Sequence, residues 1–298
     1  MERTLSEKRP RGLTAFQIKV IALVSMTLDH IGAFAFNIPV VARYEGLLRT
    51  IGRLAAPLFL FLLVQSIRHT RSKSRFVLRL YLAGMGVELF VTAMNLCFGE
   101  VFSYFTPGNI IFTFFYTALY VLLLERMSAA WRGRDIRTLA IFAGLLVLSL
   151  IPTALARADV LYDVIIPPDA SIRIKFLAAG IWNSLLPSFG GIDYGIGFSL
   201  LGVVMYFVGT KNRQCLVFAA FCLLCIAGAL TVHTSLYDLR SLGVFTDFLD
   251  LFQCQMIAAL PVMLLYNGQP GKKCKWFFYG YYPLHREAIY LISNLFAG

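Results

Sequence analysis

The chain alternates between long apolar runs and short polar connectors. Most of the runs are about 17–22 residues long, the length that an α-helix needs to cross roughly 30 Å of hydrocarbon. The pattern predicts an all-α, polytopic integral membrane helical bundle of about 9–10 transmembrane helices. The expected spans lie near 15–36, 47–67, 76–97, 109–125, 138–156, 194–210, 215–233, 247–266 and 276–296.

Composition supports this class, because 58% of the 298 residues are hydrophobic and only 14% are charged. A soluble domain does not bury that much apolar surface in one core. The net charge of +11 gathers in alternate connectors, which is the positive-inside pattern. We therefore expect a multi-pass protein of the cell membrane with a cytoplasmic N-terminus and no nucleic-acid partner.

One segment, 171–189, is ambiguous because Arg173, Lys175 and Pro187 interrupt its apolar pattern. We interpret it as an interfacial or re-entrant helix that does not cross, since a crossing would place the later basic connectors outside. Residues 1–12 are then a cytoplasmic tail, and 13–298 form a single transmembrane domain.

The six cysteines lie mostly in apolar spans, and the Cys222–Cys225 pair has no second pair beside it. Small apolar packing residues explain them better than zinc spacing does. We expect no metal site.

The first span is the most informative, because it holds Lys19, Asp29 and His30 among apolar residues. Ionisable groups are costly in hydrocarbon and mark functional sites by default. His30 lies eleven residues after Lys19, about 16 Å further along the helix. Counting rise from each helix end places Arg53 and Glu88 at the depth of His30.

Two polar layers follow from this depth count. The outer layer combines an imidazole with carboxylates and a guanidinium, which suits proton transfer near neutral pH. The inner layer is cationic and suits a phosphorylated cofactor. Each of these residues also has a simpler explanation. The membrane topology alone accounts for basic residues in the connectors, and the long side chains of Lys19 and Arg79 can reach the membrane surface. Arg53 and Glu88 could form a structural ion pair between two helices. The inner layer comprises Lys19, Arg68, Arg71, Lys73, Arg75 and Arg79.

Several stretches, in order along the chain, resemble the TraX family of membrane proteins. They are IKVIALVSMTLDHIG, LLRTIGRLAAPLFLFLLVQSIRHTRSKSRFVLRL, GVELF, GNIIFTF, IDYGIG and the terminal FFYGYYPLH; the stretch 157–192 has no counterpart. The resemblance implies N-terminal acetylation of conjugative pilin and kinship with acyltransferase-3 and heparan N-acetyltransferase-like membrane proteins. In those relatives a basic residue precedes an essential histidine by eleven positions, as Lys19 precedes His30 here, with Lys in place of Arg.

By this resemblance and the depth count, we expect an acetyltransferase that uses acetyl-CoA or another acyl-CoA, without a metal. The acceptor would be an amine or hydroxyl of a pilin, a glycan or a small molecule. The expected catalytic residues are His30, Asp29, Arg53 and Glu88; the donor-binding residues are Lys19, Arg68, Arg71, Arg75 and Arg79; the substrate-binding residues are Asp193, Tyr194 and His285.

Two other classes stay open. A proton-coupled transporter would use Lys19, His30, Glu88 and Asp250 as a relay, although the paired halves typical of transporters are not visible. A non-catalytic assembly factor would use the charges only to hold helices together, and would leave the cation cluster without a ligand.

Overall fold

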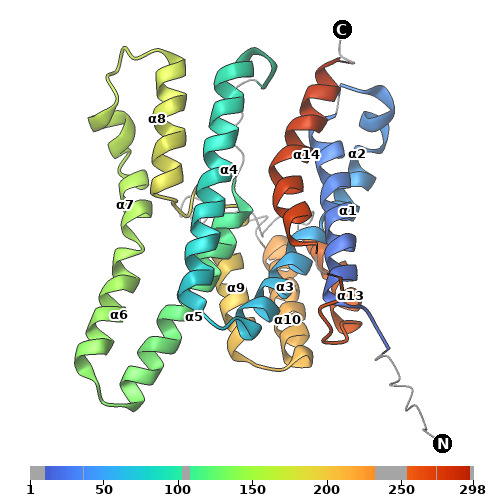
Figure 1. Ribbon diagram of the computed structural model, residues 1–298. Helices are drawn as coiled ribbons and strands as arrows, with labels where there is room; N and C mark the ends of the chain where they lie inside the picture. Colours follow the sequence, from blue (N-terminus) through green and yellow to red (C-terminus); the bar gives the residue numbers. More distant parts are fainter. Residues whose placement is uncertain (1–10, 36, 103–107, 232–253, 273, 296–298) are drawn as a thin grey trace, which may run out of the picture.

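The chain forms a bundle of α-helices, and its described residues contain no β-strand (Figure 1). The computed structural model describes residues 11–35, 37–102, 108–231, 254–272 and 274–295. The all-α membrane architecture expected from the sequence is confirmed. In chain order the elements are α1 (Ala15–Phe34), α2 (Pro39–Gly52), α3 (Ala55–His69), α4 (Lys73–Phe102), α5 (Ile110–Arg132), α6 (Ile136–Leu148), α7 (Ile151–Arg157), the π-helical η1 (Leu161–Ile165), α8 (Ile172–Leu185), α9 (Gly195–Phe207), α10 (Lys211–Thr231), the 3₁₀ segment η3 (Gln255–Ala259), α13 (Leu260–Leu264) and α14 (Lys275–Leu295).

Within these ranges, 6 helical segments are long and apolar enough to cross a membrane. Two further apolar helices, Gly195–Phe207 and Gln255–Leu264, are shorter. The six long segments are Ala15–Phe34, Pro39–His69, Lys73–Phe98, Ile110–Arg132, Ile136–Arg157 and Lys211–Gly228.

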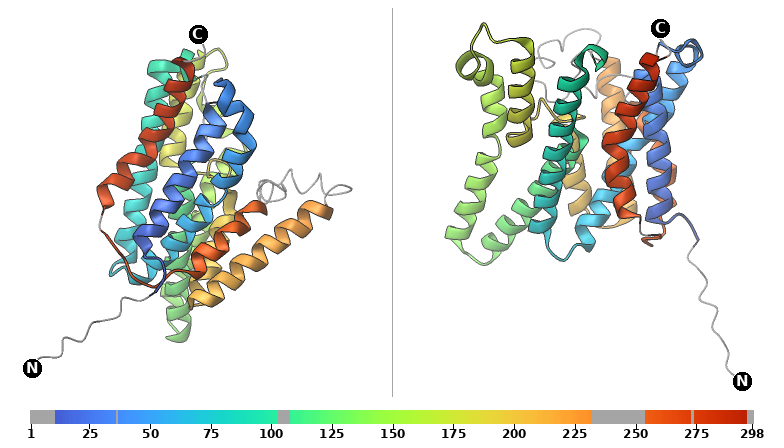
Figure 2. Two further views of the ribbon diagram at one scale, coloured as in Figure 1. Left: turned by 90° about the vertical axis from the view of Figure 1, so that its right-hand side faces the viewer. Right: turned by 45° about the horizontal axis from the view of Figure 1, so that its top comes forward.

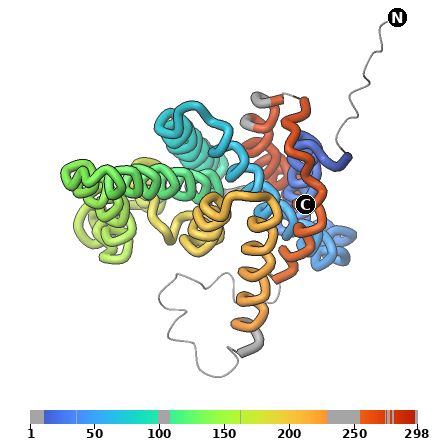
Figure 3. The backbone as a smooth tube through the Cα atoms, turned by 90° about the horizontal axis from the view of Figure 1, so that it is seen from below, coloured from blue at the N-terminus to red at the C-terminus, as the bar shows by residue number. Residues whose placement is uncertain are grey.

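Helices α3 and α6 are both apolar, but they face different surroundings. The central helix α3 buries residues all round, including Leu58, Phe61 and Val64. In contrast, α6 has no buried residue and packs mainly on α5, with which it forms an arm that extends away from α1 and α14 (Figure 3). An apolar helix without protein cover fits a lipid-facing position. The core that positions the site is therefore built around α3.

The positions of the connections between helices agree with the alternation of basic connectors. Helix α1 begins and α14 ends at opposite ends of the bundle (Figure 1). The connections α3–α4, α5–α6 and α9–α10 lie at the end where α1 begins, and these carry basic residues. We call it the lower end, as in Figure 1. Which side of the membrane it faces stays a prediction.

The expected second span, 47–67, is in fact two helices. The segment begins earlier, at Pro39, and is interrupted between α2 and α3, where Arg53 and Leu54 lie. Pro57 in the first turn of α3 has no N–H to donate to the carbonyl of Arg53, so the ladder of hydrogen bonds cannot run through unbroken. The break holds Arg53 at the junction of the two helices.

The expected span 194–210 also needs correction, because α9 has only 13 residues. The ambiguous segment 171–189 contains α8, which lies beside α4 in the upper half of the bundle, whereas α9 lies in the lower half (Figures 1 and 2). Pro187, Gly190 and Gly191 interrupt the helix between them. Together, α8 in the upper half and α9 in the lower half thus extend through the bundle, and the non-helical stretch between them lies near its middle.

The remaining expected spans differ mainly at their breaks. The span 138–156 consists of α6 and α7, which are separated at Ser149 and Leu150. The first part of the expected span 247–266, with Asp247 and Asp250, lies outside the described residues, as does most of the expected tail 1–12.

Candidate functional site

Asp29 on α1 pairs with Arg53 at the break between α2 and α3. The Arg53 guanidinium donates to Asp29 Oδ1, and Arg49 Nε lies 3.7 Å from the same oxygen. The Arg53 side chain is only 5% exposed, so this is a buried ion pair. It ties the broken second segment to α1 at the depth of His30.

The helix packing around this pair requires a glycine. A β-carbon on Gly52 would lie 2.2 Å from Asp29 Cβ, so α2 approaches α1 too closely for any side chain. On the same helix, Gly46 has no atom within 4 Å of the corresponding position.

We predict that Gly52→Ala lowers the melting temperature of the detergent-solubilised protein, because inserting a methyl group into a tight contact costs about 1–3 kcal/mol. Gly46→Ala is the matched control, and it should leave the melting temperature equal or higher because alanine favours helix. Equal losses in both variants would contradict the close approach of α1 and α2.

His30 contacts His285 of α14. His30 Nδ1 lies 2.7 Å from His285 Nε2, and His285 Nδ1 lies 2.8 Å from the carbonyl oxygen of Tyr281. The Tyr281 hydroxyl lies 2.8 Å from Thr27 Oγ1, one turn before His30 on α1. Two polar contacts one turn apart therefore join α1 and α14.

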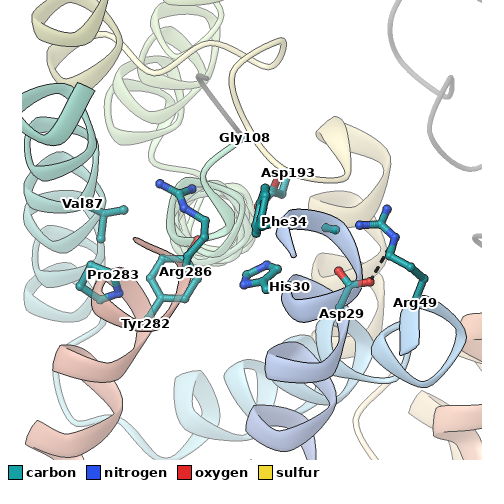
Figure 4. A pocket seen from close by; sticks show the side chains of 11 residues that line it. Asp29, His30, Phe34, Arg49, Val87, Gly108, Asp193, Tyr282, Pro283 and Arg286 are labelled. Atoms are coloured by element: carbon teal, nitrogen blue, oxygen red, sulfur yellow. Dashed lines mark ion pairs between the residues drawn. The ribbon is translucent and has the colours of Figure 1, made fainter. Parts of the chain in front are cut away.

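A cavity of about 150 Å³ opens beside this histidine pair. Figure 4 shows His30 between Asp29 and Arg49 on one side and Tyr282 and Arg286 on the other. Arg286 also pairs with Glu287, at 2.5 Å between Nη2 and Oε1. We call this space the upper cavity; its lining residues are Asp29, His30, Ala33, Phe34, Arg49, Val87, Gly108, Asp193, Tyr282, Pro283 and Arg286.

Asp193 reaches the upper cavity from the non-helical stretch between α8 and α9. It packs tightly on the start of the α5 region, since a β-carbon on Gly108 would lie 2.3 Å from Asp193 Oδ1. Its neighbour Tyr194, at φ 61°, caps α9 and contacts Phe198 rather than the cavity. The non-helical stretch between α8 and α9 thus delivers one of the three residues that we expected to bind substrate.

Glu88 is near the site but does not contact His30 or Arg53. Asn109 Nδ2 lies 3.5 Å from Glu88 Oε2 and donates to the Gly84 carbonyl at 2.9 Å. The preceding residue, Val87, lines the upper cavity, whereas Glu88 does not. Glu88 was expected at the depth of His30 as a catalytic residue, but the side chain that contacts the His30 imidazole is His285.

A second cavity of about 330 Å³, the lower cavity, lies at the other end of α1. Lys19 and His69 line it, and backbone hydrogen bonds from Leu13 to Leu265 and from Ala15 to Gln269 hold the chain segment after α13 against the start of α1. The ammonium of Lys19 lies 5.8 Å from the centre of the Phe278 ring. The residues that line the lower cavity are Ala15, Lys19, Leu62, Gln65, Ser66, His69, Tyr266, Gly268 and Pro270.

The other expected donor-binding cations do not line the lower cavity. Arg68 donates to the carbonyls of Gly209 and Tyr206 at the end of α9. Arg79 Nε donates to the Arg75 carbonyl at 3.3 Å. Arg71, Arg75 and Arg79 are exposed on the surface of the bundle.

A neighbouring cation, Lys73, pairs with Glu125 at 2.5 Å and lies 2.6 Å from the Tyr206 hydroxyl. These contacts join α4, α5 and α9, so Lys73 serves to hold these three helices together. Among the described residues, no group of three or more potential metal ligands is found.

The comparisons with known proteins bear on this arrangement. A model of the TraX protein family matches residues 15–293, which include both cavities. The chain belongs to the TraX family. This confirms the resemblance inferred from the sequence. No solved structure matches the chain.

This TraX family member is also similar to "Probable fimbrial assembly protein FimC, serogroup H1" of Dichelobacter nodosus. The two are 37% identical over 105 residues, which cover 34% of this chain and 42% of the relative. The similarity thus spans less than half the length of that relative.

Several residues at this site were not expected from the sequence, among them Arg49 and Arg286 in the lining of the upper cavity. Tyr281 and Thr27 hold the histidine pair, and Tyr282 lines the upper cavity. The spacing held a signal, because Tyr281 precedes His285 by four positions and lies on the same helix face. His69, the last residue of α3, lines the lower cavity.

Proposed function

We propose that this TraX family protein is a membrane-embedded acyltransferase that transfers an acyl group, acetyl in the first place, from acyl-CoA to an amine or hydroxyl. The observation that carries the proposal is His30, which lines a cavity at membrane depth and has a hydrogen-bonded partner at Nδ1. An imidazole held in this way is suited to act as a general base.

In the proposed reaction, His30 accepts the proton of the acceptor as its nitrogen or oxygen attacks the thioester carbonyl. The new C–N or C–O bond forms, the C–S bond breaks, and the proton passes from His30 to the departing CoA sulfur. Negative charge develops on the carbonyl oxygen during the attack, and the guanidinium of Arg286 or Arg49 beside the cavity would stabilise it. Asp29 and Arg53 would hold α1 and the break in position.

The two cavities suggest how the donor would bind. The lower cavity, with Lys19, would hold a phosphate of CoA. The helix rise from Lys19 to His30 is about 16 Å, a distance that an extended pantetheine arm spans. The upper cavity, at about 150 Å³, is smaller than pockets for drug-sized ligands, at roughly 300–1,000 Å³, and favours a short acyl chain. Roles for Arg68, Arg71, Arg75 and Arg79 in donor binding stay predictions.

A second candidate, an assembly factor, is favoured by one observation, the name of the fimbrial assembly relative. The two candidates are compatible if the acceptor is a pilin. Incubating purified protein and acetyl-CoA with a pilin-type N-terminal peptide, an amino sugar or buffer alone would test the enzyme. Acceptor-dependent release of CoA thiol supports the acyltransferase, and release equal to that of the protein-free control with every acceptor argues against it.

We predict that Lys19→Ala weakens acetyl-CoA binding roughly ten-fold or more, because a hydrogen bond to a charged group contributes about 1.5–3 kcal/mol. The turnover number should change little, since a phosphate contact stabilises ground and transition states equally. Steady-state kinetics with varied acetyl-CoA measures both quantities.

The matched control for Lys19→Ala is Arg213→Ala, which removes an exposed cation at the start of α10. It should leave both constants unchanged. A collapsed turnover number with an unchanged Michaelis constant in Lys19→Ala would move Lys19 out of donor binding and into the chemistry.

A further inference from the structure

We infer that His285 is a positioning residue that holds His30 in the tautomer with its proton on Nδ1, so that His30 Nε2 is the basic atom. The inference rests on the proposed function for its chemical meaning, although the tautomer itself can be measured separately. A chain of hydrogen bonds runs from the Tyr281 carbonyl through His285 to His30.

The proton positions follow from the two bonds of His285. A carbonyl oxygen only accepts, so His285 Nδ1, 2.8 Å from the Tyr281 oxygen, must carry a proton. In a neutral ring the other nitrogen is then an acceptor. His30 Nδ1, 2.7 Å from His285 Nε2, is therefore the donor, and His30 Nε2 carries a lone pair.

The surroundings of His285 favour the neutral ring. Its side chain is buried, and the guanidinium of Arg286 follows it in the chain. A second positive charge beside Arg286, in a buried position, would be costly. The neutral form is also the one that gives His30 a donor position at Nδ1.

Packing fixes the orientation of the His285 ring. The rings of Tyr281 and His30 both lie nearly parallel to the His285 ring, each with its centre 4.8 Å from that of His285. The Thr27 hydroxyl donates to the Leu23 carbonyl at 2.8 Å, so the Tyr281 hydroxyl is the donor to Thr27 Oγ1. Because its two neighbouring rings are themselves held in place, the His285 ring has little freedom to turn its acceptor nitrogen away from His30.

This arrangement would matter most in the transition state. When His30 Nε2 takes the acceptor's proton, the ring becomes an imidazolium and its Nδ1–H becomes a stronger donor to His285 Nε2. The bond thus strengthens as the reaction proceeds, which is the condition for lowering a barrier. His285 itself neither gains nor loses a proton.

The test is ¹⁵N NMR of the ring nitrogens in the full-length, histidine-labelled protein. The chain has 4 histidines, and His69→Gln and His233→Gln identify the resonances outside the pair. We expect His30 to show a protonated Nδ1 and an unprotonated Nε2. In His285→Leu it should change to the Nε2–H form, whereas His285→Gln, whose amide oxygen accepts in place of Nε2, should keep the original form. A wild-type His30 protonated at Nε2, or an unchanged tautomer in His285→Leu, would overturn the inference.

The rate of acyl transfer tests the role of His285 independently. His285→Gln should release CoA thiol at least ten-fold faster than His285→Leu, with the same Michaelis constant for acetyl-CoA. Equal turnover in the two variants would show a merely structural role and overturn the inference. If His285→Leu does not fold, the wild-type spectrum and His285→Gln still decide. The expected tautomer in a protein that never transfers an acyl group would refute the proposed function and leave the His285 assignment standing.

Discussion

Replacing His30 with alanine is expected to reduce acyl transfer by about 10²–10⁴-fold, the usual contribution of a general base. His30 is the histidine that lines the upper cavity, and its partner His285 is bound through Nε2 to His30 and through Nδ1 to the backbone. No other imidazole is placed to replace it among the described residues that line the cavity. Release of CoA thiol by the purified variant measures the loss.

Two controls accompany His30→Ala. Acetyl-CoA should still bind with near-normal affinity, because the lower cavity and Lys19 are about 16 Å away along α1. The melting temperature should show that the bundle is intact. A folded His30→Ala protein with wild-type transfer would remove His30 from the chemistry.

Removing Asp29 is expected to be the most destabilising of the single changes. Asp29→Ala removes the carboxylate that pairs with the buried Arg53 guanidinium, and breaking a buried pair in this way costs about 3–5 kcal/mol. Arg49, whose side chain is 30% exposed, is the matched comparison, since Arg49→Ala breaks a partly solvated contact worth about 1 kcal/mol or less. Thermal unfolding in detergent compares the two variants.

The double variant Asp29→Leu with Arg53→Met sharpens this test. It removes both charges at similar volume, and should recover much of the stability that Asp29→Ala loses, because no unpaired charge stays buried. A double variant no more stable than Asp29→Ala would show that packing, rather than the ion pair, dominates at the break.

The apolar pattern predicted the helical class well, because each segment must satisfy its backbone hydrogen bonds internally in lipid. It missed the break at Arg53, since a window average does not register one interrupted turn, whereas Pro187 did indicate the interruption before Asp193. Pro57 was a local signal for the first break and Pro187 with Gly190 for the second. Both breaks bring polar residues to the site.

The sequence also indicated the right depth for the site but not the right partners. Counting helical rise placed Arg53 and Glu88 level with His30, yet rise gives height and not the direction in which a side chain points. In the structure Arg53 pairs with Asp29, and Glu88 faces Asn109. The neighbour of His30 lies 255 positions away on α14, and only the packing of α14 on α1 reveals it (Figures 1 and 2).

The proposed transfer can be followed through the acyl group itself. Membrane vesicles from cells that naturally produce this chain, and from cells lacking it, would be supplied with acetyl-labelled acetyl-CoA on the face where α1 begins. We expect label in a covalent product only when the chain is present, and a rate of labelling about 10²–10⁴-fold lower in His30→Ala. Equal labelling with and without the chain, or full labelling by His30→Ala, would contradict the account.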